Sequence, residues 1–272
     1  MRRWTRRTRR FGPPHSRLDR RDPPAGGDSG RHGWGDVSVD ESWRYVHVLA
    51  MKLDPAWRRL PDEVRLKDAG QFERAADAAA ERVRTFTYSM VGLRADCDLL
   101  FWRLGPSAEA LEETAASLLQ AGLGRHLAVA HSMVGMVRPS QYVKTPTLQE
   151  QAMFSGERNA YLIVYPFVKT AEWYLLGREA RQGMMNEHMK VGHQYPMVRQ
   201  LLAYSFGLDD QEFIVAYETD DLAAFVDLVY ALRMTEGRKY TLRDTPILTG
   251  IHRPLREVLA LLGAPAAAEV RS

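Results

Sequence analysis

Alternating hydrophobic and polar positions predict a strand at residues 43–53 (WRYVHVLAMKL). Both sets of alternate positions are largely apolar, which is typical of a strand covered on both faces. A helix is predicted from Pro55 to about Arg84, because proline suits a first helical turn.

The next segments complete a six-element pattern in the first half of the chain. Two strands, residues 85–92 and 97–105, are joined by the polar turn 93–96. Ser107 is expected to begin a helix that ends in glycine at Gly124, since serine caps helix starts and glycine follows helix ends. Residues 127–137 then predict a further strand, and the order is β-α-β-β-α-β.

The second half of the chain repeats this order with different residues. It predicts a strand at 161–170, a helix from about Trp173 to Gly192, strands at 198–208 and 212–220, a helix at 221–237 and a short strand near 246–249. Two tandem ferredoxin-like repeats are the simplest interpretation, and the fold class is α+β. Each repeat leaves one sheet face bare, so the two sheets are expected to pack or close into a barrel-like core, with a pocket possible between sheet and helices.

The pattern also divides the chain into segments. Residues 1–38 combine arginine, proline and glycine with almost no periodic apolar positions, and we expect a disordered extension there. The N-terminal ferredoxin-like repeat is placed at 39–140 and the C-terminal ferredoxin-like repeat at 141–262. A flexible tail is expected at 263–272.

Composition excludes several classes of protein. The chain of 272 residues has a net charge of +3, but the arginines are concentrated in its first 31 positions and the rest is acidic, so we expect no nucleic-acid partner. The single cysteine, Cys97, cannot form an intramolecular disulfide, which fits a reducing cytoplasm. No apolar run reaches the roughly 18 residues of a membrane span, so no stable membrane insertion is expected.

His188 is the first residue with candidate chemistry. On a helix, Met184, His188 and Val191 fall at i, i+4 and i+7 and share one face. A histidine on an apolar helical face is usually a core residue with one satisfied hydrogen bond. The functional alternative is a neutral imidazole that ligates heme iron beside an apolar wall.

Tyr165 and Lys169 form a second candidate pair in the strand YLIVYPFVKT. Residues i and i+4 of a strand project from the same face, so the phenol and the ammonium are expected to point into one space. The alternative is that both residues are structural, with the tyrosine packed in the wall of the barrel and the lysine at its rim. Pro166 lacks an N–H donor and indicates an edge, a bulge or an interrupted ladder at this point of the strand.

Several longer motifs resemble the chlorite dismutase family, in its coproheme decarboxylase branch. The motifs are YPFVKTAEWYLL, MMNEHMKVGHQYP, YSFGLDDQEFIVAYETD, LRMTEGRKYTLRDTP and SMVGMVRPSQYVK. They occur in the family's order, and the resemblance covers roughly Trp43 to Thr249. The resemblance implies a dimeric α+β barrel built from the two repeats, a homopentamer, and heme binding in the second repeat.

The resemblance also implies roles for individual residues. His188 matches the axial ligand of the heme iron, and Tyr165 matches the tyrosine that forms a radical in the decarboxylases. Lys169 matches a lysine that contacts a propionate. Glu236 matches a glutamate near the axial histidine, where an acceptor would fix the tautomer of the imidazole.

The residue on the distal side of the iron has two candidates, the adjacent Arg199 and Gln200. They must face opposite sides if both lie in a strand. Counting back from GLDDQEF favours Gln200 for the distal pocket, whereas counting forward from His188 reaches Leu201. Arg238 departs from the decarboxylases, which often have serine at that position.

The implied reaction is oxidative decarboxylation of two propionates of iron coproporphyrin III (coproheme) by hydrogen peroxide, giving heme b. Coproheme would then be substrate and redox cofactor together. One alternative is chlorite dismutation, with heme b as a permanent cofactor. Another is a heme-binding protein without turnover, which would keep His188 but not need Tyr165.

Overall fold

The computed structural model describes residues 44–138, 142, 153 and 156–266. The extension predicted at residues 1–38 lies outside the described residues, as does most of the predicted tail. Within the described part of the chain, no helix is long and apolar enough to span a membrane.

Nine strands form the sheet in the described part of the chain. They are β1 Tyr45–Leu53, β2 Arg84–Ser89, β3 Leu99–Gly105, β4 Leu127–Met136, β5 Tyr161–Lys169, β6 Arg199–Tyr204, β7 Phe213–Thr219, β8 Thr241–Arg243 and β9 Leu248–His252. All their pairings are antiparallel. Strands and helices together confirm the α+β fold class.

The strand pairings form a closed circuit. The order is β7-β6-β4-β1-β3-β2-β9-β5, and β5 pairs again with β7. The joints between the two halves are short, with one residue pair between β4 and β6 and two between β2 and β9. Within each half, the fourth strand lies beside the first, the first beside the third and the third beside the second.

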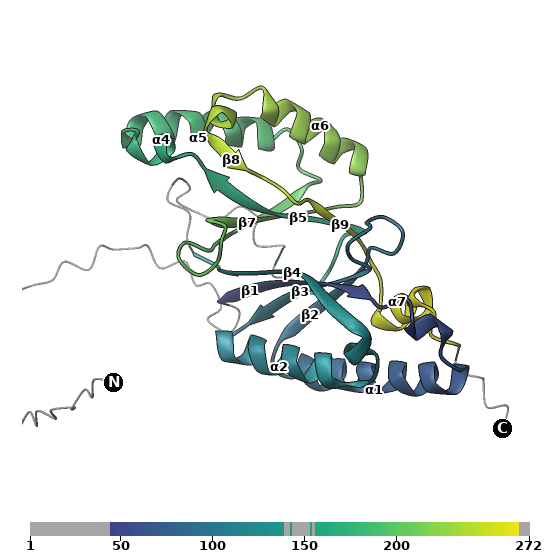
Figure 1. Ribbon diagram of the computed structural model, residues 1–272. Coiled ribbons are helices and arrows are strands. Elements are labelled where there is room, and N and C mark those ends of the chain that lie inside the picture. Colours follow the sequence, from purple (N-terminus) through teal and green to yellow (C-terminus); the bar gives the residue numbers. More distant parts are fainter. Residues whose placement is uncertain (1–43, 139–141, 143–152, 154–155, 267–272) are drawn as a thin grey trace, which may run out of the picture. The chain divides into compact units, whose positions relative to one another are not determined.

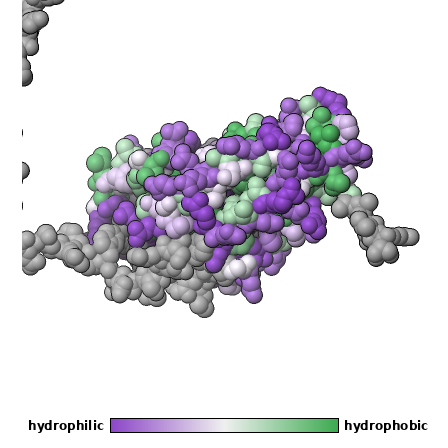
Figure 2. Space-filling model, turned by 90° about the horizontal axis from the view of Figure 1, so that it is seen from below, coloured by the Kyte–Doolittle hydropathy of each residue, from purple (hydrophilic) through white to green (hydrophobic). Residues whose placement is uncertain are grey.

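Helices cover the outside of the two halves in separate layers. The helical segments are η2 Trp57–Arg59, α1 Asp62–Ala80, α2 Ala108–Gln120, η3 Gly122–His126, α4 Ala171–Leu175, α5 Arg178–Gly192, α6 Leu222–Arg233, η4 Glu236–Tyr240 and α7 Leu255–Leu262. In Figure 1, α1 and α2 lie below the strands of the first half, and α4, α5 and α6 lie above those of the second half. Seen from below, the molecular surface carries hydrophilic side chains over much of its area (Figure 2).

Two predicted helix starts are confirmed by capping hydrogen bonds. The Ser107 hydroxyl accepts a hydrogen bond from the backbone N–H of Ala110 at 3.1 Å and caps α2. Asp221 caps α6 in the same way, by accepting from Ala223 and Ala224 at 2.9 and 3.0 Å. Short polar side chains therefore fix where these helices begin.

Two long helices predicted from the sequence are interrupted. The helix expected from Pro55 to Arg84 is divided into η2 and α1, because Leu60 precedes a proline and is extended, with ψ of 154°. The strand that follows already includes Arg84. The helix expected from Trp173 to Gly192 is broken where Leu176 and Gly177 are extended, with ψ of 146° and 152°.

The last elements also differ from the pattern. The final strand is β9, which begins at Leu248 rather than at Pro246. The three-residue strand β8 and helix α7 were not predicted. β8 is too short to show alternation, and it is defined by its pairing with β5.

The interior of the strand circuit is a single apolar cluster to which both halves contribute. It includes Val48 and Trp102 from the first half and Leu162, Val164 and Ala216 from the second, each fully buried. The bare faces of the two sheets thus bury one another. Burial of this area is the main favourable contribution to folding.

The predicted interruption at Pro166 is confirmed. On one edge β5 pairs with β7 without a gap from Tyr161 to Phe167. On the other edge its pairing with β9 ends at Val164, and its pairing with β8 begins at Val168 with a register shift. The residue that cannot donate a ladder hydrogen bond lies between the two ladders.

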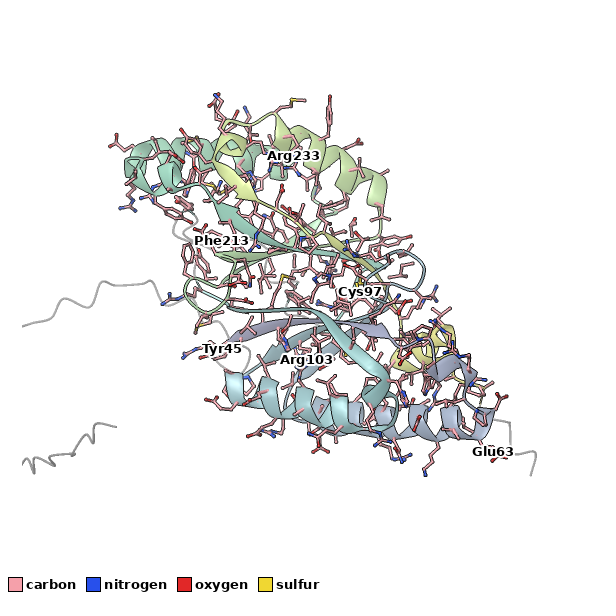
Figure 3. All side chains as sticks on the ribbon, viewed as in Figure 1. Tyr45, Glu63, Cys97, Arg103, Phe213 and Arg233 are labelled. Atoms are coloured by element: carbon pink, nitrogen blue, oxygen red, sulfur yellow. The ribbon has the colours of Figure 1, made fainter. Side chains whose placement is uncertain are left out.

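A buried polar pair lies between the first sheet and α2. Arg103 is fully buried, and its guanidinium lies 2.8 Å from Nδ1 of His47, whose Nε2 lies 3.0 Å from the Ser132 hydroxyl. Figure 3 shows Arg103 on this lower side of the strands. Burial, with the charge of Arg103, lowers the pKa of His47 from 6.5 to about 3.

This depressed pKa predicts a pH dependence of stability. The unfolded chain takes up the His47 proton near pH 6.5 and the folded chain only near pH 3, so folding stability is lost as the pH falls through this window. His47→Gln should make the loss between pH 6.5 and 4.5 shallower, by up to about 1.4 kcal/mol per pH unit. Urea unfolding of both proteins at three pH values measures the difference. If the free energy of unfolding depended on pH in the same way in both proteins, the prediction would be contradicted.

Candidate functional site

His188 lies on α5, the helix that covers the second sheet. Its side chain is half-buried, and among the described residues no hydrogen-bond partner of its ring is found. Burial, then the charge of Lys169, lowers the pKa of His188 from 6.5 to about 4, although Glu187 opposes the shift. The imidazole is therefore neutral near pH 7 and has a free nitrogen lone pair, as a metal ligand requires.

Tyr165 lies on the face of β5 that is turned toward the helices. It belongs to an apolar cluster that also includes Val191 of α5 and Leu232 and Phe225 of α6. The pKa of Tyr165 is raised well above 10, first by burial and then by Tyr217 through charge and a hydrogen bond. The phenol thus remains protonated, and any oxidation of it must release a proton as well as an electron.

Lys169 ends the same strand, and its ammonium group points toward η4. The Nζ atom donates to the Gly237 carbonyl at 3.4 Å and lies 4.2 Å from the ring centroid of Trp173. Burial lowers the pKa of Lys169 to about 8, and the charge of Arg238 adds to this effect. Since the Lys169 charge acts on His188, strand and helix approach one another here.

The strand register separates the two distal candidates. Gln200 is paired with Tyr217 of β7, which is paired on its other side with Ile163 of β5. Residues directly opposite in antiparallel strands share a face, so Gln200 lies on the face of Tyr165. Arg199 is paired with Glu218 and therefore lies on the opposite face of the sheet, which is turned toward the interior of the strand circuit.

Glu236 begins η4, close to α5. Its backbone N–H donates to the Glu187 carboxylate at 3.0 Å, so η4 is attached to the residue next to His188. The Glu236 carboxylate itself accepts from Lys239 at 2.8 and 3.0 Å at the surface. A contact between this carboxylate and the His188 ring stays a prediction.

The structure thus places the predicted residues on two facing surfaces. His188 is on the helix side, and Tyr165, Lys169 and Gln200 are on the sheet side. Sequence reasoning missed Tyr217, which is buried beside Tyr165. The sequence did contain a signal, because Tyr217 and Val215 are two residues apart in an apolar strand and so share one face. Which strand lies beside that face could not be inferred from the alternation.

A second group missed from the sequence is a charged cluster at the end of α6. The Asp244 carboxylate accepts from Arg233 at 2.6 Å and from Arg238 at 2.7 Å. Arg233 lies in the helical layer above the strands in Figure 3. The charges of Asp244 and Arg233 both act on the Tyr165 phenol, so this cluster lies beside the site.

Another set of metal-ligand side chains lies in the first half. Among the described residues, Asp96, Cys97 and His131 offer ligand atoms within 4.8 Å of one another. The Asp96 carboxylate, however, is already held by two hydrogen bonds from Arg94, each 2.7 Å long. A cation there would have to compete with a guanidinium, and His188 is the better candidate for a metal ligand.

Comparison with known proteins identifies the family. The family model described as chlorite dismutase matches residues 65–253, and the chain belongs to this family. A coproheme decarboxylase from Mycolicibacterium smegmatis is 36% identical over 177 residues, which cover 64% of this chain and 75% of that protein. The family includes heme-dependent enzymes of both names.

Solved structures agree with this assignment. Chlorite dismutase from Candidatus Nitrospira defluvii in complex with imidazole has a TM-score of 0.74 and 30% identity, covering 82% of this chain and 96% of that one. A variant of the same enzyme in complex with cyanide has a TM-score of 0.74 and 29% identity, covering 83% and 96%. The described fold is therefore shared over nearly the whole length of these relatives.

The electrostatic link between strand and helix can be tested on the ligand-free protein. Lys169→Met removes a positive charge that lowers the pKa of His188, so this pKa should rise above about 4 while burial keeps it below 6.5. Nuclear magnetic resonance of histidine-labelled protein measures the titration. Lys190→Met, which removes an exposed charge from α5 itself, is the matched control. Equal shifts in both variants would contradict the specific link.

Proposed function

We propose that this protein decarboxylates two propionates of iron coproporphyrin III with hydrogen peroxide and forms heme b. The observation that carries the proposal is the pairing of two facing surfaces, with the neutral imidazole of His188 on α5 and the Tyr165 phenol and Gln200 on one sheet face. The similarity to a coproheme decarboxylase supports it.

The residues fit an iron porphyrin. His188 would hold the iron, since its imidazole is neutral and has no hydrogen-bond partner among the described residues. Apolar side chains around Val191 and Phe225 suit the macrocycle. When bound, the iron supplies the redox chemistry that peroxide drives.

Tyr165 would take part in the reaction as the hydrogen-atom acceptor. Its phenoxyl radical would abstract a hydrogen atom from the β-carbon of a propionate. Removal of one further electron, for which the same peroxide is the final acceptor, with loss of carbon dioxide would leave a vinyl group. For each propionate, one peroxide and one proton are consumed, and one carbon dioxide and two waters are released. The raised pKa of Tyr165 excludes a phenolate at neutral pH, so the radical forms by joint loss of a proton and an electron.

Lys169 would hold the reacting carboxylate as a point charge. A pKa of about 8 leaves most of the ammonium groups charged at neutral pH. The Gly237 carbonyl and the Trp173 ring, which contact Nζ in the ligand-free protein, are weaker partners than a carboxylate. The ammonium can therefore turn from these partners to a propionate at small cost.

The assembly and compartment are part of the same proposal. Two ferredoxin-like repeats, 39–140 and the heme-binding 141–262, would form a dimeric α+β barrel, as the closed circuit of pairings and the repeated strand order support. We further propose a cytoplasmic homopentamer with no nucleic-acid partner.

Chlorite dismutation with resident heme b is the second candidate. It is supported by the similarity to chlorite dismutase structures. An arginine over the iron is expected for that activity, whereas the register turns Arg199 away from the face of Tyr165. A heme-binding protein without turnover would need His188 alone.

One experiment separates these functions. The purified protein is loaded with iron coproporphyrin III and titrated with peroxide, and the porphyrin is followed by mass spectrometry. We expect two successive losses of a carboxyl unit. Absence of any loss would refute the decarboxylase, and oxygen release from chlorite would instead support the second candidate.

Two variants assign the roles within this assay. Tyr165→Phe should retain porphyrin binding and lose turnover by at least about a hundredfold, because phenylalanine has no O–H bond to give up. His188→Ala should weaken binding, as measured by the Soret absorption. Full turnover in Tyr165→Phe would rule out its radical role.

A further inference from the structure

Tyr217 lies between the two candidate residues on the sheet face. It is 4% exposed, and its ring centroid is 6.2 Å from that of Tyr165 with an interplanar angle of 30°. Its direct partner across the other edge of β7 is Gln200. One buried phenol is thus a neighbour of both residues.

The strand register makes this placement rigid. Tyr165 is paired with Val215, two residues from Tyr217 on the same strand and face. Tyr165 and Tyr217 are therefore diagonal neighbours across an antiparallel pair, within reach for long side chains. Because β7 is paired along both edges, with β5 and with β6, it cannot slide without breaking two ladders.

The side chain of Tyr217 lies in an apolar cluster. Phe225 of α6 packs against its ring at 5.3 Å between centroids. Burial raises the pKa of Tyr217, and Tyr165 opposes this rise, as a neighbour of its hydroxyl would. A buried hydroxyl without a hydrogen bond is costly, and Tyr165 presents a second phenol beside that of Tyr217. Phenylalanine would fill the same apolar space without a hydroxyl.

We propose that Tyr217 is a positioning residue for Tyr165, holding its phenol hydroxyl by a hydrogen bond in the orientation that the reacting propionate requires. The inference rests on the proposed function, and it assigns to the reaction a residue that acts through Tyr165. A tyrosine that merely fills the core would be replaceable by phenylalanine without effect on Tyr165.

The hydrogen bond is tested first in the ligand-free protein. Tyrosine labelled at Cζ gives separate resonances for O–H and O–D forms when the hydroxyl exchanges slowly, as a buried and bonded hydroxyl does. Tyr217→Phe should accelerate exchange of the Tyr165 hydroxyl by about tenfold or more. Tyr230→Phe on the same side of the protein, at a residue 67% exposed on α6, is the matched control and should leave it unchanged.

The positioning role is tested next in the peroxide assay. Tyr217→Phe should bind iron coproporphyrin III with unchanged affinity and lower the rate constant of the first decarboxylation by roughly tenfold, the effect of one lost hydrogen bond. The Tyr230→Phe rate should match that of the unmodified protein.

The outcomes distinguish this inference from the proposed function. If the unmodified protein itself fails to lose carboxyl units, the proposed function fails and the catalytic role of Tyr217 with it, whereas the exchange measurement still decides the hydrogen bond. If the unmodified protein is active, unchanged exchange or an unchanged rate in Tyr217→Phe overturns the inference. A weakened affinity with an unchanged rate would also overturn it, since it would indicate a role in binding.

Discussion

Strand β5 is hydrogen-bonded along both of its edges, and this constraint determines the rest of the second half. It pairs with β7 on one side and with β9 and β8 on the other. A strand fixed in this way offers each side chain only two environments. Leu162 and Val164 face the buried interior that both halves share, and Tyr165 faces the helices. The strand that closes the circuit of pairings thus also presents Tyr165 to the helical layer.

Local patterns were sufficient to predict most of the elements, and they indicated candidate chemistry on some of them. Alternation located β5 and its proline, and capping residues located the starts of α2 and α6. Motif resemblance supplied the roles proposed for His188 and Tyr165. These features depend on residues within a few positions of one another. Over such a short distance, the spacing in the sequence determines the direction in which each side chain points. The two incorrectly predicted helices also have local causes. Each is interrupted by extended residues, Leu60 in one case and Leu176 and Gly177 in the other, within a stretch that otherwise favours a helix.

Relations between distant strands could not be read from the sequence in this way. The choice between Arg199 and Gln200 depended on which residue of β7 each one opposes, and a shift by one position would exchange their faces. Tyr217 escaped notice for the same reason, because it is significant only as a neighbour of a strand some fifty residues earlier. The Asp244 cluster joins η4 and α6 through side chains alone. Such contacts form only when distant segments come together in the complete fold, so no pattern of neighbouring residues in the sequence predicts them.

Lys169 shows how one charge can serve both surfaces of the site. Its sequence position places it on the strand of Tyr165, but the register shift after Val168 and the contact with η4 bring its ammonium near α5. There its charge helps to keep the imidazole of His188 unprotonated, which is the form that binds a metal. A propionate bound by the same ammonium would neutralise part of this charge and so ease protonation of a free imidazole. Since the pKa of His188 is about 4, a partial loss of this charge still leaves the imidazole neutral near pH 7. Under the proposed function, Lys169 can therefore hold a carboxylate while His188 keeps the lone pair that a metal requires.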